Sequence, residues 1–351
     1  MLLTSALATP AAATGSGAAG GGFDYTNKAS YILDMRSAGL EFEDHIPAVI
    51  YQDVGYSGVN LSHDIGEAQG RCESDGATYW LGQYVEEAVL GKGAAPPDAG
   101  SVQGGYQNPV YARDVKPNIA AGNSLSDRSP GITNYLPPGQ RIAPIPSDGT
   151  PVYVTAHCDS DVKGSGSGNV ADLVNNADVV GSTTTSNLDR ATGVYTTTAR
   201  AYVTGIKNAG DLNTINSFMQ VSQKPDGSQP LVTYRLSFFT AAPGGSRTAF
   251  GRKGFTFSGN NVPADQLTKQ FNSQAATLSA AGSALGPLGF QVLAPKTGVE
   301  GSTEAGTTGL HYITAPAIQG EAGLKSRNGT VGQDQYARFG SITFTGIYNQ
   351  P

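Results

Sequence analysis

The chain has 351 residues, of which 47 are Gly and 20 are Pro, and 14% of them are charged, against roughly 25% in an average soluble domain. An apolar fraction of 38% is sufficient for a hydrophobic core and excludes a highly charged disordered chain. No stretch approaches the roughly 20 consecutive apolar residues of a membrane span. A net charge of -6, with 22 scattered Lys and Arg residues, argues against nucleic-acid binding.

The first 22 residues carry signals of export. Met1 to Ala8, followed by Thr9 to Ala13, resembles the end of a signal-peptide core that runs into an A-x-A cleavage site, although the preceding basic residues are missing. A linker of small residues follows over 14–22. We therefore predict a truncated signal-peptide remnant and linker over 1–22, with a disordered Ala/Gly tail as the alternative, and a secreted or cell-envelope protein.

Cys72 and Cys158 are the two cysteines of the chain, and an even number in an exported protein predicts a disulfide. A bond between Cys72 and Cys158 would close a long loop of the chain. In the chain-entropy model, closing such a loop stabilises the fold by about 4–5 kcal/mol. Two free buried thiols are the alternative. Neither cysteine belongs to a C-x-x-C motif, so neither is expected to be catalytic.

Residues 23–150 are expected to form an irregular, loop-rich region with one short helix. Apolar residues within Tyr79 to Leu90 recur at i, i+3, i+4, i+7 and i+8, and Gly91 is placed to end that helix. The stretch 91–150 is dense in Gly, Pro, Asn and Asp. We expect it to wrap around the surface or to contain short strands.

Residues 151–351 are expected to form an antiparallel β domain. Asp189 to Gly193 and Lys224 to Gly227 are predicted turns, because Pro presets the backbone and Gly accepts a positive φ. Between the turns, apolar and polar residues alternate with a period of two, which indicates strands with one buried face. The predicted strands lie near 152–158, 177–187, 194–204, 215–221, 232–238, 255–257, 290–293, 310–313 and 341–348.

An Ala-rich helix is predicted between Pro263 and Leu285. Pro263 suits its first turn, an apolar stripe that includes Leu267 and Phe271 faces one side, and Gly286 and Pro287 end it. A helix faced largely by Ala lets a sheet approach closely, so we expect it to dock on the strands. The predicted fold class is therefore β-rich α+β: an antiparallel sheet or sandwich with one docked helix at about 263–285 and an irregular N-terminal region.

The order of elements over about 150–295 resembles a group of uncharacterised exported proteins of high-GC Gram-positive bacteria. The resemblance depends on the Asp189 to Gly193 turn, the Thr/Ala-rich strand Thr196 to Thr204, the Pro225-Asp226-Gly227 hairpin, the helix from Pro263 and the segment Leu288 to Val292. It implies no known activity. Several members of the group carry a C-terminal choice-of-anchor segment, which this chain lacks, so the resemblance implies a released protein.

Local motifs for catalysis or metal binding are incomplete. The segment Asp159 to Gly164 matches the first, third and sixth positions of a calcium loop, but its fifth position is Lys163 and its twelfth is Val170. Calcium bound through Asp159 and Asp161 is thus an alternative to a solvated acidic turn, and no other cofactor is expected. G-x-S-x-G, H-E-x-x-H and P-loop motifs are absent from the sequence, so an enzyme is not favoured.

We therefore predict a monomeric, non-enzymatic exported protein that binds a hydrophobic or lipid-like molecule or an envelope polymer. A cleft between the helix and the sheet would be lined by Tyr202, Phe218, Tyr234 and Phe271, with an ordinary hydrophobic core as the alternative role of these four residues. One alternative function is an extracellular glycan or cell-wall hydrolase that uses Glu41, Asp44 or Asp159. Another is a self-assembling structural envelope protein with exposed edge strands.

Overall fold

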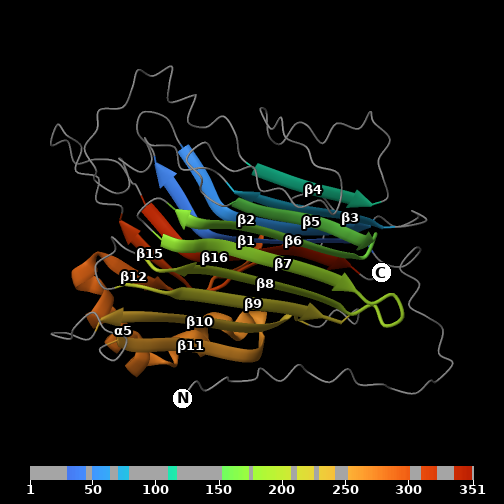
Figure 1. Cartoon of the computed structure of the whole chain (residues 1–351). Coiled ribbons are helices and arrows are strands. Elements are labelled where there is room, and N and C mark those ends of the chain that lie inside the picture. Colours follow the sequence, from blue (N-terminus) through green and yellow to red (C-terminus); the bar gives the residue numbers. More distant parts are fainter. Residues whose placement is uncertain are drawn as a thin grey trace, which may run out of the picture.

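The computed structural model describes residues 30–44, 50–63, 70–78, 110–116, 152–173, 177–206, 212–224, 229–241, 252–300, 310–321 and 336–349. Within these ranges the chain forms two antiparallel β-sheets that face each other, with two short α-helices at one end (Figure 1). The predicted β-rich α+β class with a sandwich is confirmed. The signal-peptide remnant, the helix Tyr79 to Leu90 and the hairpin turn at 225–227 lie outside the described residues.

The seven-stranded sheet is a meander in which strands adjacent in sequence pair with each other. Buried and more exposed residues alternate along its strands, because successive side chains of a strand point to opposite faces. Every strand predicted between 152 and 238 is found in it. Its strands are β5 (Val152–Ser160), β6 (Lys163–Leu173), β7 (Ala177–Leu188), β8 (Tyr195–Thr204), β9 (Ile215–Gln223), β10 (Leu231–Ala241) and β11 (Arg252–Pro263).

The nine-stranded sheet joins the two ends of the described chain. Its order is β12-β15-β16-β1-β2-β3-β4, and the β13–β14 hairpin pairs with β16 through β14. Strand β1 pairs with β16 along most of its length, so residues from the regions 23–150 and 151–351 share one sheet. Its strands are β1 (Ser30–Asp44), β2 (Ile50–His63), β3 (Arg71–Thr78), β4 (Val110–Lys116), β12 (Phe290–Leu293), β13 (Thr297–Glu300), β14 (Leu310–Thr314), β15 (Ala317–Glu321) and β16 (Tyr336–Asn349).

Strands β1 to β4 occupy parts of the region for which the sequence predicted irregular structure. Their buried positions include Ser37, Ser57, Ser74 and Gly76, which are small residues rather than large apolar ones. The apolar and polar alternation that identifies a strand is therefore weak there. Strand β6 (Lys163–Leu173) is absent from the predicted strands for the same reason.

Glycine residues let the two sheets touch through their backbones. A Cβ atom added to Gly76 of β3 would lie 2.2 Å from the carbonyl oxygen of Ser167 in β6. A Cβ added to Gly166 of β6 would lie 2.1 Å from the carbonyl oxygen of Asp75 in β3. Facing sheets usually pack about 10 Å apart with side chains between them. Because no side chain fits between these backbones, β3 and β6 are in direct contact.

A cluster of four buried hydroxyl groups lies between the sheets beside this contact. Ser57 of β2 lies within hydrogen-bonding distance of two residues of β7, with oxygen–oxygen distances of 2.9 Å to Ser182 and 2.8 Å to Thr184. Ser37 of β1 lies 3.0 Å from both Ser57 and Thr184. Since buried polar groups are stable only when they are hydrogen-bonded, the cluster fixes the position of one sheet relative to the other.

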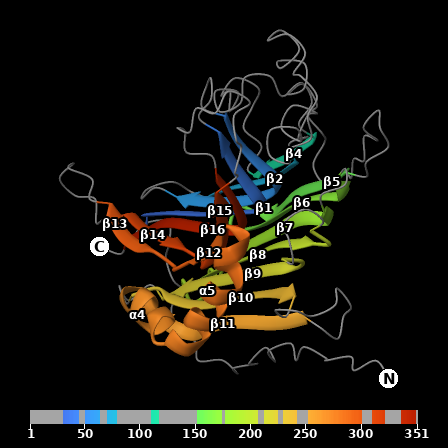
Figure 2. The same ribbon diagram turned by 90° about the vertical axis from the view of Figure 1, so that its left-hand side faces the viewer.

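The opposite end of the sandwich is filled by aromatic rings and helices. Helices α4 (Leu267–Asn272) and α5 (Ala275–Leu285) both contact β11, and α5 also contacts β12 in the other sheet. Figure 2 shows them at the end of the molecule where β11 and β12 lie. Short 3-10 turns flank them as η3 (Ala264–Gln266) and η4 (Gly286–Leu288). None of the described helices is long and apolar enough to cross a membrane.

The predicted single helix from Pro263 to Leu285 is divided in two. Residue 263 ends β11, and the helical backbone is interrupted at Ser273 and Gln274. The Gln274 side chain donates to the Tyr234 hydroxyl at 3.1 Å and to the Ser258 carbonyl oxygen at 3.3 Å. These bonds to β10 and β11 hold Gln274 against the sheet, where its ψ of 38° departs from the helical range.

Candidate functional site

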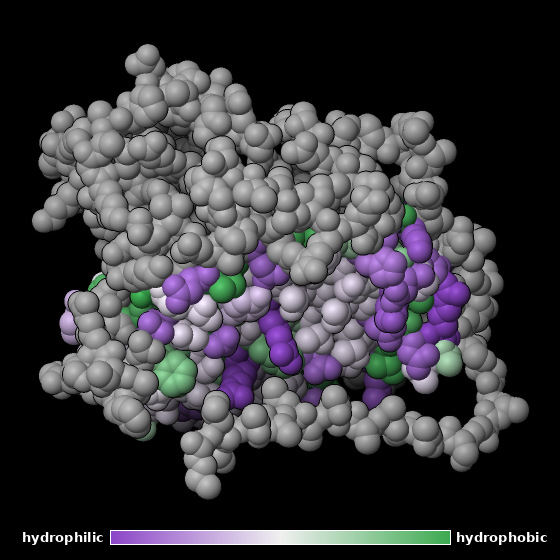
Figure 3. Space-filling view, viewed as in Figure 1, coloured by the Kyte–Doolittle hydropathy of each residue, from purple (hydrophilic) through white to green (hydrophobic). Residues whose placement is uncertain are grey.

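The outer face of the seven-stranded sheet, which points away from the other sheet, is covered mainly by uncharged polar side chains. On β8 and β9 the outward positions include Thr196, Thr198, Asn216, Gln220 and Ser222, which are half-buried or exposed. Figure 3 views this face and shows residues of intermediate hydropathy across its middle, interrupted by separate strongly hydrophilic side chains. A surface of this composition offers many hydrogen-bonding groups and few charges.

The register of the strands arranges these outward side chains in rows across the sheet. In one row, Arg200 of β8 lies opposite Thr183 of β7 on one side and Phe218 of β9 on the other. Phe218 in turn lies opposite Arg235 of β10, which lies opposite Ser258 of β11. We term this set the arginine row: Thr183, Arg200, Phe218, Arg235 and Ser258.

The two arginines of this row lie on either side of an aromatic ring. Arg200 and Arg235 are exposed, Phe218 is half-buried, and the Arg200 guanidinium carbon lies 5.5 Å from the centroid of the Phe218 ring. Within the described part of the chain, neither guanidinium forms an ion pair with a carboxylate. The row therefore presents two guanidinium groups that no carboxylate of the described residues pairs with.

A second row runs beside the arginine row and is uncharged. Tyr202 of β8 lies opposite Gly181 of β7 and Asn216 of β9. Its hydroxyl donates to the Asn169 side-chain oxygen on β6, and partial burial raises the pKa of Tyr202 above its ordinary value. The tyrosine therefore stays neutral and contributes a ring and a hydroxyl to the face.

The four residues predicted to line one ligand cleft lie on two opposite faces of the sheet. Tyr202 and Phe218 are on the outer face, whereas Tyr234 and Phe271 are each 1% exposed in the interior. The Phe271 ring lies 6.2 Å from the Tyr234 ring and 5.3 Å from the Phe257 ring, measured between centroids. The structure therefore brings the four together only as two separate pairs, and the inner pair belongs to the hydrophobic core.

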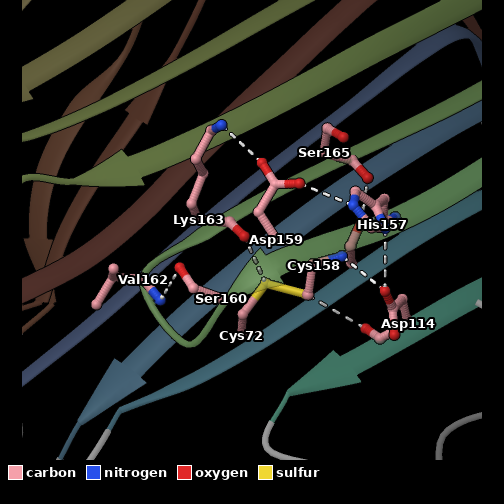
Figure 4. The surroundings of a disulfide bond; sticks show 10 residues. Cys72, Asp114, His157, Cys158, Asp159, Ser160, Val162, Lys163 and Ser165 are labelled. Atoms are coloured by element: carbon pink, nitrogen blue, oxygen red, sulfur yellow. Dashed lines mark hydrogen bonds and ion pairs between the residues drawn. A yellow bond between two sulfur atoms is a disulfide. The ribbon is translucent and has the colours of Figure 1, made fainter. Parts of the chain in front are cut away.

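The predicted disulfide between Cys72 and Cys158 is confirmed and joins β3 to β5, which belong to different sheets (Figure 4). The side chain of Asp114, on β4, is buried beside it. Its Oδ2 accepts a hydrogen bond of 2.8 Å from the Cys158 backbone N–H. The disulfide thus lies where β3, β4 and β5 meet, and it links the N-terminal strands covalently to the meander.

A chain of polar contacts runs outward from the disulfide. His157 Nδ1 lies 3.5 Å from Asp114 Oδ2, and its Nε2 lies 2.7 Å from Asp159 Oδ1. Lys163 Nζ lies 2.6 Å from the other oxygen of Asp159 and, with His157, lowers the pKa of that carboxyl (Figure 4). Because both imidazole nitrogens face carboxylates, His157 is held in a chain of polar contacts rather than presented to a nucleophile.

The two residues predicted to bind calcium have separate protein partners. Asp159 is exposed and contacts His157 and Lys163, as described above. Asp161 is buried, forms an ion pair with Arg190 and accepts a 2.9 Å hydrogen bond from the Gly70 backbone N–H. Among the described residues, no group of three or more His, Cys, Asp or Glu side chains is arranged to hold a metal ion. Asp161 instead ties together three loop segments at the ends of the strands.

The carboxylates considered for a hydrolase are likewise separated. Glu41 is buried on β1, and its Oε2 lies 3.1 Å from Arg338 Nη1 on β16. Asp159 belongs to the other sheet and pairs with Lys163. The side chain of Asp44 lies outside the described part of the chain. Glu41 and Asp159 therefore have different cationic partners in different sheets and do not form a catalytic pair.

Comparison with models of protein families finds no family that matches this chain, and comparison with curated proteins finds no similar one.

The sequence alone predicts only part of the arginine row. Alternation along each strand places Arg200 and Arg235 on the face opposite the buried residues. Which of their neighbours lie beside them depends on the register between strands, and register is set by packing as well as by turns. Phe218 was identified as a ligand residue, but its position between two arginines follows only from the pairing of β8, β9 and β10.

Proposed function

We propose that the protein is an exported, non-enzymatic binding module of the extracellular space or cell envelope, and that it binds a glycan polymer along the outer face of the seven-stranded sheet. The observation that carries this proposal is the composition of that face. It combines rows of hydroxyl and amide side chains with the partly exposed rings of Tyr202 and Phe218. Hydroxyl-rich ligands need many hydrogen-bonding partners, and aromatic rings cover the apolar C–H faces of sugars.

The extended shape of the face favours a polymer over a small molecule. Tyr202 and Phe218 lie on adjacent strands, and hydrogen-bonding side chains surround them from β6 to β11. Neighbouring strands are separated by about 4.8 Å, so the face spans several sugar units. A hydrophobic ligand is less favoured, because Tyr234 and Phe271, two of the four residues predicted to hold it, lie inside the core.

The disulfide supports the proposed location. Disulfides persist in oxidising surroundings outside the cytosol, and the Cys72–Cys158 bond is buried between the two sheets. Cell fractionation of the host, followed by non-reducing electrophoresis of each fraction, tests this part of the proposal. Recovery of the protein in the cytosol with both thiols reduced would contradict export.

Binding is tested with the full-length oxidised protein on a panel of purified neutral and acidic polysaccharides. We expect wild-type protein to bind at least one polymer, and we expect a double variant, Tyr202→Ala with Phe218→Ala, to bind it roughly tenfold more weakly or worse, as for aromatic hot spots in other interfaces. Ile32→Ala is the matched control, because Ile32 is 46% exposed on the other sheet. Absence of binding to every polymer, or equal losses in the double variant and the control, would overturn the proposal.

A further inference from the structure

We propose that the arginine row makes the outer face selective for glycans that carry carboxylate groups. This inference rests on the proposed function, since it specifies the ligand of the same face. It concerns three residues, Arg200, Phe218 and Arg235, which lie side by side on β8, β9 and β10.

The first argument is geometric. Arg200 pairs in register with Phe218, and Phe218 pairs with Arg235, so all three side chains leave the same face at the same level of the sheet. The two arginines are therefore separated by two strand spacings, about 9.5 Å between their backbones. A polymer lying across the strands would meet a cation, an apolar ring and a second cation in succession.

The second argument is electrostatic. The neighbouring outward side chains of β8 to β10, such as Thr198, Gln220 and Thr233, are uncharged. In the described part of the chain, no carboxylate pairs with Arg200 or Arg235, although the protein as a whole has a net charge of -6. Two unneutralised cations on a neutral surface attract an anionic ligand. The planar guanidinium group binds carboxylates through two parallel hydrogen bonds.

The third argument concerns the ring between the cations. Arg200 lies over the Phe218 ring at 5.5 Å, and this cation–π contact restricts the orientations of the guanidinium before a ligand binds. Such preorganisation lowers the entropy lost on binding. The apolar ring also matches a polymer in which carboxylates alternate with the C–H faces of sugar rings. A phosphodiester chain without sugar rings offers no such apolar face.

Nucleic acid is a poorer fit to the same row. Binding to a phosphate backbone depends on many Lys and Arg contacts, and proteins that use it carry dense basic patches. Among the outward side chains described on β8 and β9, Arg200 alone is charged, so these strands carry no dense basic patch. Two positive charges about 9.5 Å apart suit sparse carboxylates better than a continuous phosphate backbone.

The experiment compares polygalacturonate with the same polymer in its methyl-esterified form, which has the same sugars but no charge on the esterified carboxyls. Binding of the full-length oxidised protein is measured by calorimetry for wild type, Arg200→Gln, Arg235→Gln and the double variant. Arg71→Gln is the matched control, because Arg71 is exposed on β3 of the other sheet. Thermal unfolding of each variant verifies that the fold is retained.

We expect wild type to bind polygalacturonate more tightly than the ester, with an affinity that falls as salt is added. The double arginine variant should bind polygalacturonate at least tenfold more weakly than wild type and lose most of that salt dependence. Its affinity for the ester should equal that of wild type. The Arg71→Gln control should bind both polymers as wild type does. Equal binding of both polymers by wild type, or an equal loss for both in the double variant, would overturn the carboxylate selectivity and leave the polymer-binding function intact. Tighter binding of poly(glycerol phosphate) than of polygalacturonate would also overturn it. Failure to bind any polymer would remove both proposals.

Discussion

Glycine and serine residues determine how closely the two sheets approach. Where β3 faces β5 and β6, the contact is made by backbone atoms, because Gly76 and Gly166 leave no side chain between them. Beside it, the buried hydroxyls of Ser57, Ser182 and Thr184 bond to one another. Small residues at these positions replace the large apolar ones of an ordinary sandwich core, and the sheets gain polar contacts in place of buried apolar area.

Adding one methyl group at this contact should lower the free energy of unfolding. A Cβ at Gly166 would lie 2.1 Å from the Asp75 carbonyl oxygen, so Gly166→Ala forces two backbones apart, and we expect a loss of about 3 kcal/mol, at the upper end of overpacking effects. Urea unfolding measures it. The control is Gly282→Ala on helix α5, where a Cβ meets nothing within 4 Å and should stabilise the protein by up to about 1 kcal/mol. Similar unfolding midpoints for the two variants would contradict the close contact.

The turn between β7 and β8 depends on a carboxylate. Asp189 accepts hydrogen bonds from the Thr192 hydroxyl at 2.7 Å and the Ala191 backbone N–H at 2.9 Å, and these bonds hold its pKa below its ordinary value. Since the folded pKa is lowered, the stabilisation is present above the unfolded pKa of about 3.9 and is lost as pH falls through the folded value. Asp189 is exposed, so Asp189→Ala should cost only about 0.5–1 kcal/mol at pH 7.

The pH dependence separates the charge from the turn geometry. Asp189→Asn keeps an oxygen acceptor but does not titrate, so its free energy of unfolding should approach that of wild type as pH falls from 5 to 2. Chemical denaturation at several pH values measures this difference. A wild-type advantage that is constant across the range would show that the carboxylate charge contributes nothing.

Most strands of the meander could be predicted from the sequence, whereas most strands of the nine-stranded sheet could not. Strands such as Tyr195–Thr204 place Tyr, Ala and Val on one face and Thr on the other, which gives a clear period of two. In β1 to β3 and in β6, glycine and serine occupy buried positions, so the period is hidden. The pairing of β1 with β16 joins residues about 300 positions apart, and local pattern carries no information on such contacts.

The candidate site was predicted in part for a similar reason. Tyr202 and Phe218 were selected as aromatic ligand residues, and both lie on the outer face. Tyr234 and Phe271 were placed with them, although alternation already puts residue 234 on the buried side of β10. The row that unites Arg200, Phe218 and Arg235 needs the register of three strands, which sequence alone does not provide.

Helix α4 should depend on Phe271 for its position. The ring is 1% exposed and packs against Tyr234 and Phe257, so Phe271→Ala leaves a cavity and should cost about 3–5 kcal/mol. Phe271→Leu retains most of the volume and should cost less. Thermal and urea unfolding measure both variants. If Phe271→Ala retained wild-type stability while losing affinity for a hydrophobic ligand, the ring would belong to a binding cleft and not to the core.

In the molecule as a whole, the two sheets are joined by a disulfide and by complementary packing at both ends. Glycine contacts and the hydroxyl cluster join β2 and β3 to β6 and β7, whereas helix α5 joins β11 to β12 at the other end, where α4 also packs on β11. Arg200 and Arg235, by contrast, are exposed on the outer face of the meander, and no carboxylate of the described residues pairs with them. Replacing these two arginines by Gln should therefore change binding with little effect on the free energy of unfolding.

Reduction of the Cys72–Cys158 disulfide should lower the free energy of unfolding substantially. It links residues 86 positions apart in different sheets, and the chain-entropy model assigns a closed loop of that length about 4–5 kcal/mol. Urea unfolding of wild type, reduced wild type and Cys72→Ala with Cys158→Ala measures this contribution. We expect the reduced protein and the double variant to unfold at the same lower urea concentration, because both lose the constraint on the unfolded chain. Equal midpoints for oxidised and reduced wild type would mean that the hydroxyl cluster and the glycine contacts hold the sheets together without the bond, and that the buried sulfurs act only as part of the core.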